Sequence, residues 1–166
     1  MTLISKQYLK QNRKLHKKSK GYGSSGYVWA PVVLHMMRDN GCKNVLDYGA
    51  GKGTLGVTLG DFVQNYDPVT FPLDPKPADL LVCLDVLEHI EPEMLDAVLA
   101  HMRSLMKVCG LLTICTRPAQ KNLPDGRNAH LIVEQEDWWV ARLTGAGFIV
   151  RIMETDHPDT LLVEVR

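Results

Sequence analysis

Residues 44–53 read Asn-Val-Leu-Asp-Tyr-Gly-Ala-Gly-Lys-Gly, and this stretch decides the fold. An apolar run leads into an acidic residue and then into glycines at every second position, Gly49, Gly51 and Gly53. Because glycine tolerates positive φ and has no Cβ to obstruct a ligand, the pattern predicts a buried strand that turns sharply into a helix. The amides at the start of that helix are expected to face a ligand. The stretch therefore predicts a cofactor-binding loop.

Two classes of cofactor compete for this loop. Gly51-x-Gly53-x-x-Gly56 also matches the dinucleotide fingerprint, which is a weak signal when it stands alone. The dinucleotide loop brings a helix N-terminus to a pyrophosphate, and Asp47, just before the glycines, would repel that group. A carboxylate at this place suits a ligand that carries an ammonium group and no phosphate.

The rest of the chain alternates between strand and helix patterns. We expect helices at 28–40 (with Pro31 in the first turn), from residue 54, at 92–108 and at 134–144. We expect strands at 44–48, 61–66, 80–84, 111–116, 148–153 and 160–165, the last two as an antiparallel hairpin. A proline-dense segment, 68–78, replaces a full helix and strand. The order predicts an α/β fold, a doubly wound, Rossmann-like and mostly parallel sheet with a C-terminal antiparallel hairpin.

The loop and this order of elements resemble the class I S-adenosylmethionine-dependent methyltransferases, whose first motif is apolar-Asp-x-Gly-x-Gly-x-Gly. The resemblance runs from about residue 22 to the C-terminus and implies a single methyltransferase domain over residues 21–166. It implies S-adenosyl-L-methionine as cofactor. The residues that it implies for cofactor binding lie at three strand ends: Asp47, Tyr48, Gly49, Ala50, Gly51, Gly53, Asp67, Pro68, Asp85 and Val86.

Two of these strand ends have motifs of their own. Asp67 comes twenty positions after Asp47, where a carboxylate can accept hydrogen bonds from both ribose hydroxyls of an adenosyl group. Residues 85–90, Asp-Val-Leu-Glu-His-Ile, follow the central strand and resemble the fourth motif of small-molecule methyltransferases of the ubiquinone-biosynthesis type. In the family, Thr70, Phe71 and Asp74 would be the only substitutes for its usual adenine contacts.

Two histidines are candidates for acid–base catalysis. His89 lies in the 85–90 motif, and His130 precedes the last predicted helix. Imidazole titrates near neutral pH, so either residue could remove a proton from an oxygen or nitrogen acceptor or hydrogen-bond to it. The run 123–131 with the Trp138-Trp139 pair resembles small methyltransferases of tailed bacteriophages and their hosts. Residues 22–29 are predicted to be either a plain linker or a flap over the cofactor.

The sequence favours methyl transfer to an oxygen or nitrogen atom, most simply of a small molecule. Two alternatives remain open. One is a nucleic-acid methyltransferase guided by the N-terminus, and the other is a non-catalytic Rossmann-like binding protein. Residues 1–20 carry seven Lys or Arg side chains and no acidic residue, although the 166-residue chain has zero net charge. Ile4, Tyr8 and Leu15 fall near one helical face, so this basic segment is predicted to be an amphipathic helix docked on the domain.

The composition of the chain limits which classes of protein it can belong to. Hydrophobic residues make up 45% of the chain and charged residues 23%, as in globular proteins. No apolar stretch approaches the length of a membrane span, and the N-terminus lacks the apolar core of a signal peptide, so the cytoplasm is the expected compartment. The four cysteines have no paired metal-ligand spacing, and no metal site is predicted.

Overall fold

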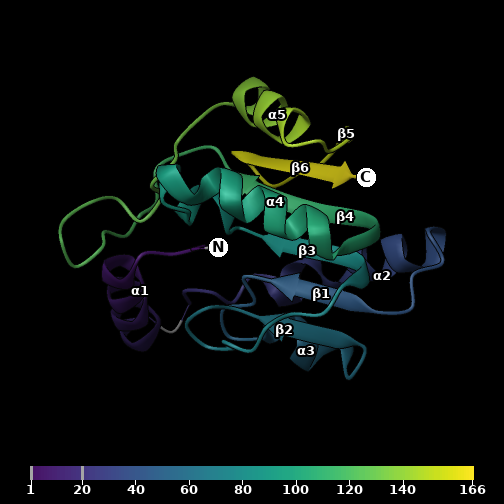
Figure 1. Ribbon diagram of the computed structural model, residues 1–166, viewed down its shortest axis with the longest axis horizontal. Coiled ribbons are helices and arrows are strands. Elements are labelled where there is room, and N and C mark those ends of the chain that lie inside the picture. The colour runs from purple at the N-terminus through teal and green to yellow at the C-terminus, as the bar shows by residue number, and fades with distance from the viewer. Residues whose placement is uncertain (1, 20) are drawn as a thin grey trace.

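The computed structural model describes residues 2–19 and 21–166, and within these ranges six strands form one sheet (Figure 1). The spatial order is β2-β1-β3-β4-β6-β5. The strands are β1 (Val45–Tyr48), β2 (Val63–Tyr66), β3 (Ala78–Leu84), β4 (Met106–Cys115), β5 (Val150–Met153) and β6 (Thr160–Val165). The first four pair in parallel, whereas β6 is antiparallel to both β4 and β5. The predicted fold class, with its C-terminal antiparallel hairpin, is confirmed.

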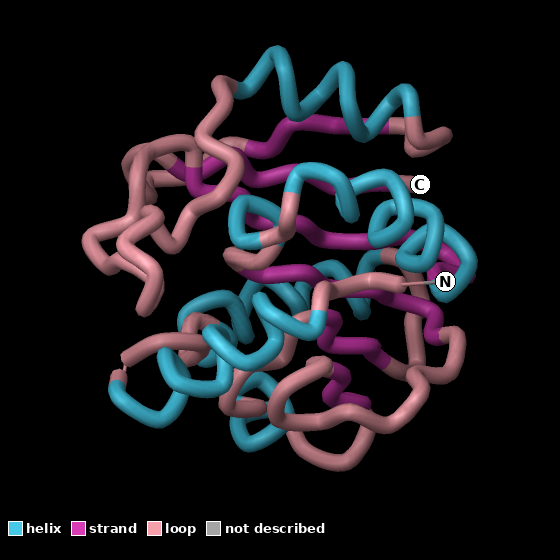
Figure 2. The backbone as a smooth tube through the Cα atoms, turned by 60° about the vertical axis from the view of Figure 1, so that its left-hand side comes forward, coloured by secondary structure: helices cyan, strands magenta, loops and turns pink. Residues whose placement is uncertain are grey.

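Helices cover both faces of this sheet, which Figure 2 shows as a stack of neighbouring strands. On one face, α2 (Gly26–Asp39) and α3 (Thr54–Leu59) pack against Leu80 and Val82. On the other face, α4 (Leu95–Leu105) and α5 (Glu136–Gly145) pack against Leu81 and Cys83. Alternate residues of β3 thus enter two separate cores, which explains why a central parallel strand is a continuous apolar run in the sequence.

Several predicted boundaries are wrong by a few residues. Helix α2 begins at Gly26, so Pro31 lies beyond its first turn. The predicted helix over 92–108 is a short 3-10 turn, Pro92–Met94, followed by α4, which ends at Leu105. Strand β4 starts directly afterwards because Met106 pairs with Ala78 of β3. Helical spacing of apolar residues does not show where such pairing begins, since the partner strand is distant in sequence.

The proline-dense connection between β2 and β3 contains no strand among the residues that the structure describes, so β2 is an edge of the sheet. Its only sheet-like feature is an isolated bridge between Asp67 and Phe71. This bridge closes a tight turn directly at the carboxyl end of β2. The turn therefore fixes the side chain of Asp67 close to the ends of the neighbouring strands.

The basic segment contains helix α1 (Lys6–Lys18), which docks on the domain. Its first residues are held by Ser5, whose backbone N–H and hydroxyl donate to the carboxylate of Glu91 at 2.7 and 2.6 Å. Farther along the helix, Tyr8 and Leu15 are buried with Leu123 and other apolar residues of the loop before α5. The basic side chains of α1 lie on the opposite, exposed face. Lys20, which belongs to the predicted basic segment, lies outside the described residues.

Over the described part of the chain, every helix is too short or too polar to cross a lipid bilayer.

The docking of α1 predicts a local effect of Leu15→Ala. Removing this buried side chain should cost about 2–5 kcal/mol, and most of it should fall on the docking of α1, because Leu15 packs only in this cluster. We expect amide hydrogen exchange within α1 to accelerate more than tenfold, with exchange in β3 and β4 unchanged. Leu9→Ala, on the same helix outside the cluster, is the matched control. Equal acceleration in both variants would contradict this packing.

Candidate functional site

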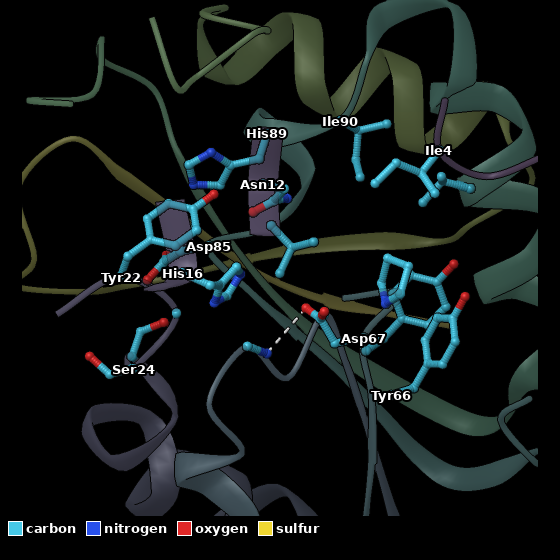
Figure 3. A pocket seen from close by; sticks show the side chains of 18 of the residues that line it. Ile4, Asn12, His16, Tyr22, Ser24, Tyr66, Asp67, Asp85, His89 and Ile90 are labelled. Carbon is cyan, nitrogen blue, oxygen red and sulfur yellow. Dashed lines mark hydrogen bonds between the residues drawn. The ribbon is translucent and has the colours of Figure 1, made fainter. Parts of the chain in front are cut away.

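A cavity of about 420 Å³ lies at the carboxyl ends of β1, β2 and β3 (Figure 3). Its floor is formed by residues at these strand ends: Tyr48, Gly49, Gly51, Tyr66, Asp67, Pro68, Asp85 and Val86. Its roof comes from α1 and from the turn that follows it, through residues such as Tyr8, His16 and Tyr22. Ligands of open α/β sheets bind at this edge, so the cavity lies where the fold places a site.

The glycine loop needs its glycines for close packing. Gly49 has φ of 84°, and a Cβ there would lie 2.4 Å from the side chain of Val86. Gly51 has φ of 54°, and its Cβ would lie 2.6 Å from the carbonyl oxygen of Gly23. An L-residue at either position would be strained and would also clash. The prediction of a sharp turn that requires glycine is therefore confirmed.

The amides of the glycine loop are engaged within the protein. Those of Gly49 and Ala50 both donate to the carbonyl of Tyr66, at 2.8 and 2.9 Å. The amide of Lys52 donates to the carbonyl of Gly23 at 2.8 Å. The first residues of α3, Thr54 and Leu55, pack closely against Gly26 and are not among the residues that line the cavity. That the amides at the start of this helix face a ligand stays a prediction.

Asp67 is 7% exposed and lines the cavity. Its Oδ1 accepts from the amides of Val69 and Thr70, at 2.7 and 3.0 Å. Its Oδ2 accepts only one long bond, 3.3 Å from the amide of Gly51 (dashed in Figure 3). One carboxylate oxygen thus fixes the turn after β2, while the other keeps the capacity to accept further hydrogen bonds.

Asp85 closes the end of β3 in a strained conformation. Its φ of 56° is left-handed, which costs free energy for a residue with a side chain. The buried hydroxyl of Thr113 holds it there, since this hydroxyl donates to Asp85 Oδ1 at 2.7 Å and lies 2.9 Å from the Asp85 amide nitrogen. The strain directs the Asp85 side chain into the cavity wall beside Val86.

Three buried or half-buried groups gather beside the cavity. Ligand atoms of Glu88, His89 and His130 all lie within 4.8 Å of one another. Burial raises the pKa of Glu88 to about 8, and the nearby charge of Asp85 adds to this. Burial, and then the neighbouring His130, lower the pKa of His89 to about 4. Burial also lowers the pKa of His130. Both imidazoles are therefore neutral at neutral pH.

Of the predicted site residues, Asp47, Ala50, Gly53 and His130 do not line the cavity. Asp47 is 3% exposed within the sheet, and burial followed by the charge of Asp67 raises its pKa to about 7. The rings of His130 and His89 are 4.7 Å apart, so His130 stands behind the cavity wall. For these four residues, cofactor binding or catalysis stays a prediction.

The predicted flap divides into two parts. Tyr22, Gly23, Ser24 and Ser25 lie against the cavity, whereas Trp29 is buried in the α2 core. Sequence reasoning missed Asn12 and His16 as lining residues and Glu88 as a buried group. An amphipathic pattern shows that α1 docks, but it does not show what lies beneath it. The suggested adenine residues Thr70, Phe71 and Asp74 lie outside this cavity.

No family model and no curated protein sequence matches this chain. Solved structures match its fold. A DhpI–SAH complex aligns over 98% of both chains with a TM-score of 0.66 and 15% identity. The 1,6-didemethyltoxoflavin-N1-methyltransferase of Burkholderia thailandensis, with bound S-adenosylhomocysteine, covers 100% of this chain and 92% of its own, with a TM-score of 0.64 and 18% identity. Magnesium protoporphyrin IX methyltransferase from Synechocystis, with bound SAM, aligns over 99% of this chain and 93% of its own length, with a TM-score of 0.56 and 18% identity. The chain thus shares the fold of these methyltransferases.

The raised pKa values predict how stability depends on pH. A buried carboxyl that prefers its protonated form stabilises the fold below its unfolded-state pKa, and this stabilisation is lost as pH rises through the folded-state pKa. For Glu88 that window runs from 4.5 to about 8. Between pH 4.5 and 8.5 we expect the free energy of unfolding to fall, and Glu88→Gln to remove on the order of 2–5 kcal/mol of that fall.

Denaturant unfolding in EDTA-containing buffer at these two pH values measures the effect. Asp47→Asn should remove a further part of the fall in the free energy of unfolding, since the pKa of Asp47 is also raised. Glu93→Gln, at an exposed position, is the control and should keep the wild-type slope. If Glu88→Gln kept the wild-type slope as well, the assigned burial of Glu88 would be wrong.

Proposed function

We propose that this protein is an S-adenosylmethionine-dependent methyltransferase that binds its cofactor in the cavity at the ends of β1–β3. One observation carries the proposal. The glycine loop, through Gly49 and Gly51, and the Oδ2 atom of Asp67, which accepts one long hydrogen bond, meet in one cavity. They do so in a fold shared with cofactor-bound methyltransferases.

The charge of the cavity supports this cofactor over a dinucleotide. Among the described lining residues are three carboxylates, those of Asp67, Asp85 and Glu91, and one lysine, Lys121. A pyrophosphate would meet net negative charge here, whereas a ligand with an ammonium and a sulfonium group would be attracted. The amides of the glycine loop, which hold a pyrophosphate in the dinucleotide fold, are used within the protein.

Different side chains of the cavity are suited to different parts of the cofactor. Asp67 Oδ2 is suited to accept hydrogen bonds from ribose hydroxyls, because its partner Oδ1 already fixes the carboxylate in place. Asp85, held by Thr113, is suited to the cationic end of the cofactor. His89 lies at the same end of the cavity, on the turn that follows Asp85.

Methyl transfer depends mainly on how the acceptor is oriented relative to the methyl group of the cofactor. The cofactor supplies an electrophilic methyl group, and holding a nucleophile in line with it can contribute about 7–11 kcal/mol in favourable cases. An oxygen or nitrogen acceptor must also lose a proton. His89 donates its Nδ1 proton to the carbonyl of Ala129, so Nε2 is the atom able to accept one. The cavity is partly covered by α1 and has the size of small-molecule sites, which favours a small acceptor.

A second candidate function, methylation of nucleic acid, is favoured by the outer face of α1. This face exposes six cations: Lys6, Lys10, Arg13, Lys14, Lys17 and Lys18. A hollow beside it is lined by Arg13, His16, Lys17 and Lys52 together with Val69 and Thr70, without any carboxylate. Such a surface attracts phosphate backbones.

The cofactor assignment predicts the effect of Asp67→Asn. Loss of one carboxylate oxygen should weaken binding of S-adenosylmethionine at least tenfold in titration calorimetry, because the ribose contacts are charge-assisted. Asp74→Asn, in the same connection but outside the cavity, should bind as wild type. His130→Ala should have a far smaller effect than Asp67→Asn. Tight binding of NAD without binding of S-adenosylmethionine would overturn the assignment.

Salt dependence separates the two candidate functions. For a small-molecule enzyme we expect weak binding to single- or double-stranded oligonucleotides, and no loss of cofactor affinity in a Lys10→Gln/Lys14→Gln variant. Fluorescence anisotropy between 50 and 200 mM salt measures the oligonucleotide affinity. A nucleic-acid enzyme would lose affinity steeply, with a slope of about −0.9 per contacted phosphate, and the variant would flatten that slope.

A further inference from the structure

A 3-10 turn and a distant loop bring three potential metal ligands together beside the cavity. Glu88 and His89 lie in the 3-10 turn Leu87–His89, after β3. His130 lies in the loop before α5, more than forty positions later. One ligand atom from each residue lies within 4.8 Å of the other two. The lack of metal-ligand spacing among the cysteines has no bearing on this cluster, since none of its members is a cysteine.

Both imidazoles are fixed with the same nitrogen available. His89 Nδ1 lies 2.7 Å from the carbonyl oxygen of Ala129, and His130 Nδ1 lies 2.6 Å from that of Arg117. A carbonyl oxygen only accepts, so each Nδ1 must carry the proton and each Nε2 must carry the lone pair. Metal-ligating histidines are usually oriented in this way, by a backbone carbonyl that accepts from the other ring nitrogen.

Glu88 supplies an unpartnered oxygen. The residue is 0% exposed, and its Oε1 accepts from the amide of Cys115 at 3.1 Å. Within residues 2–19 and 21–166, its Oε2 has no hydrogen-bond partner. A buried carboxylate oxygen without a partner is costly, and a cation beside it would remove that cost. Among the described residues, no lysine or arginine forms an ion pair with Glu88.

We propose that Glu88, His89 and His130 bind a divalent transition-metal cation at the wall of the cavity. Two imidazole nitrogens and one carboxylate oxygen suit Mn²⁺, Fe²⁺, Co²⁺ or Zn²⁺ better than Mg²⁺ or Ca²⁺. Ligands about 2.1 Å from one ion at tetrahedral angles lie about 3.4 Å apart, so a pair of ligand atoms at the 4.8 Å limit would have to close by roughly 1.4 Å through side-chain rotation. Of the three side chains only that of His89 lines the cavity, and its Nε2, once bound to the cation, would no longer serve as a base.

The role of the cation rests on the proposed function. A metal-bound hydroxyl group has a lowered pKa, so an acceptor oxygen bound here would lose its proton more readily. That would favour an oxygen acceptor over an amine. The binding site itself rests only on the three side chains and is tested without turnover.

The test uses the full-length protein, stripped with a chelator and titrated with Co²⁺. We expect one Co²⁺ per chain, with visible absorption bands typical of bound cobalt, and a higher melting temperature than in the metal-free protein. Glu88→Gln keeps the shape of the side chain but cannot supply a carboxylate ligand, and it should weaken Co²⁺ binding at least tenfold. His130→Gln should do the same. His35→Gln, on the exposed surface of α2, is the matched control.

S-adenosylmethionine binding to the same stripped samples is measured in parallel. Co²⁺ binding without binding of S-adenosylmethionine would support the metal site and overturn the proposed function. Binding of S-adenosylmethionine without Co²⁺ binding would support the proposed function and overturn the metal site. Absence of stoichiometric Co²⁺ binding, or equal binding by wild type, Glu88→Gln and His130→Gln, would overturn the metal site. A cooperative melting transition of metal-free Glu88→Gln shows that the variant folds, so that its loss of Co²⁺ binding supports the site.

Discussion

The close approach of backbone to backbone at Gly51 is the constraint on which the rest of the site depends. The backbones of Gly23 and Gly51 are in direct contact, with no side chain between them. The side chain of Val86 packs directly against the backbone of Gly49. These contacts join three parts of the chain: the turn after α1, the loop after β1 and the end of β3. A Cβ at Gly51 would push the turn that carries Gly23 and Tyr22 outward, and a Cβ at Gly49 would displace Val86 at the end of β3. The glycines therefore assemble the site as well as shape a loop.

Much of the fold follows from local patterns in the sequence. The continuous apolar run of β3, the glycine turn and the C-terminal hairpin each have a short-range signal, and all three are present. Boundaries were less predictable, because Met106 leaves the helical pattern only through its pairing with Ala78. The use of the loop amides by Tyr66 and Gly23 also depends on neighbours that are distant in sequence. Local patterns thus specify the elements, while long-range contacts decide which groups remain available to a ligand.

The same distinction explains what could be predicted of the site. Asp67 and Asp85 follow strands, and strand ends converge, so both were found from their positions and both line the cavity. Asp47 precedes the turn by two residues and lies inside the sheet, where its side chain is buried. Glu88 lies in the 85–90 motif, whose sequence gives no sign that this side chain is buried. Its burial depends on the loop that carries His130, and no periodicity within residues 85–90 reports that loop.

The roof of the cavity has a kinetic consequence. Helix α1 is held by the two hydrogen bonds from Ser5 to Glu91, by one from Gln11 to Asp125, and by the burial of Tyr8 and Leu15. Because α1 covers the cavity only in part, a bound molecule can leave through the open side, and local opening of the N-terminal helix would widen that path. Firmer docking of α1 therefore slows exchange without preventing it. Since the fastening contacts are made by the N-terminal segment, such an opening is a local event that proceeds without unfolding the sheet.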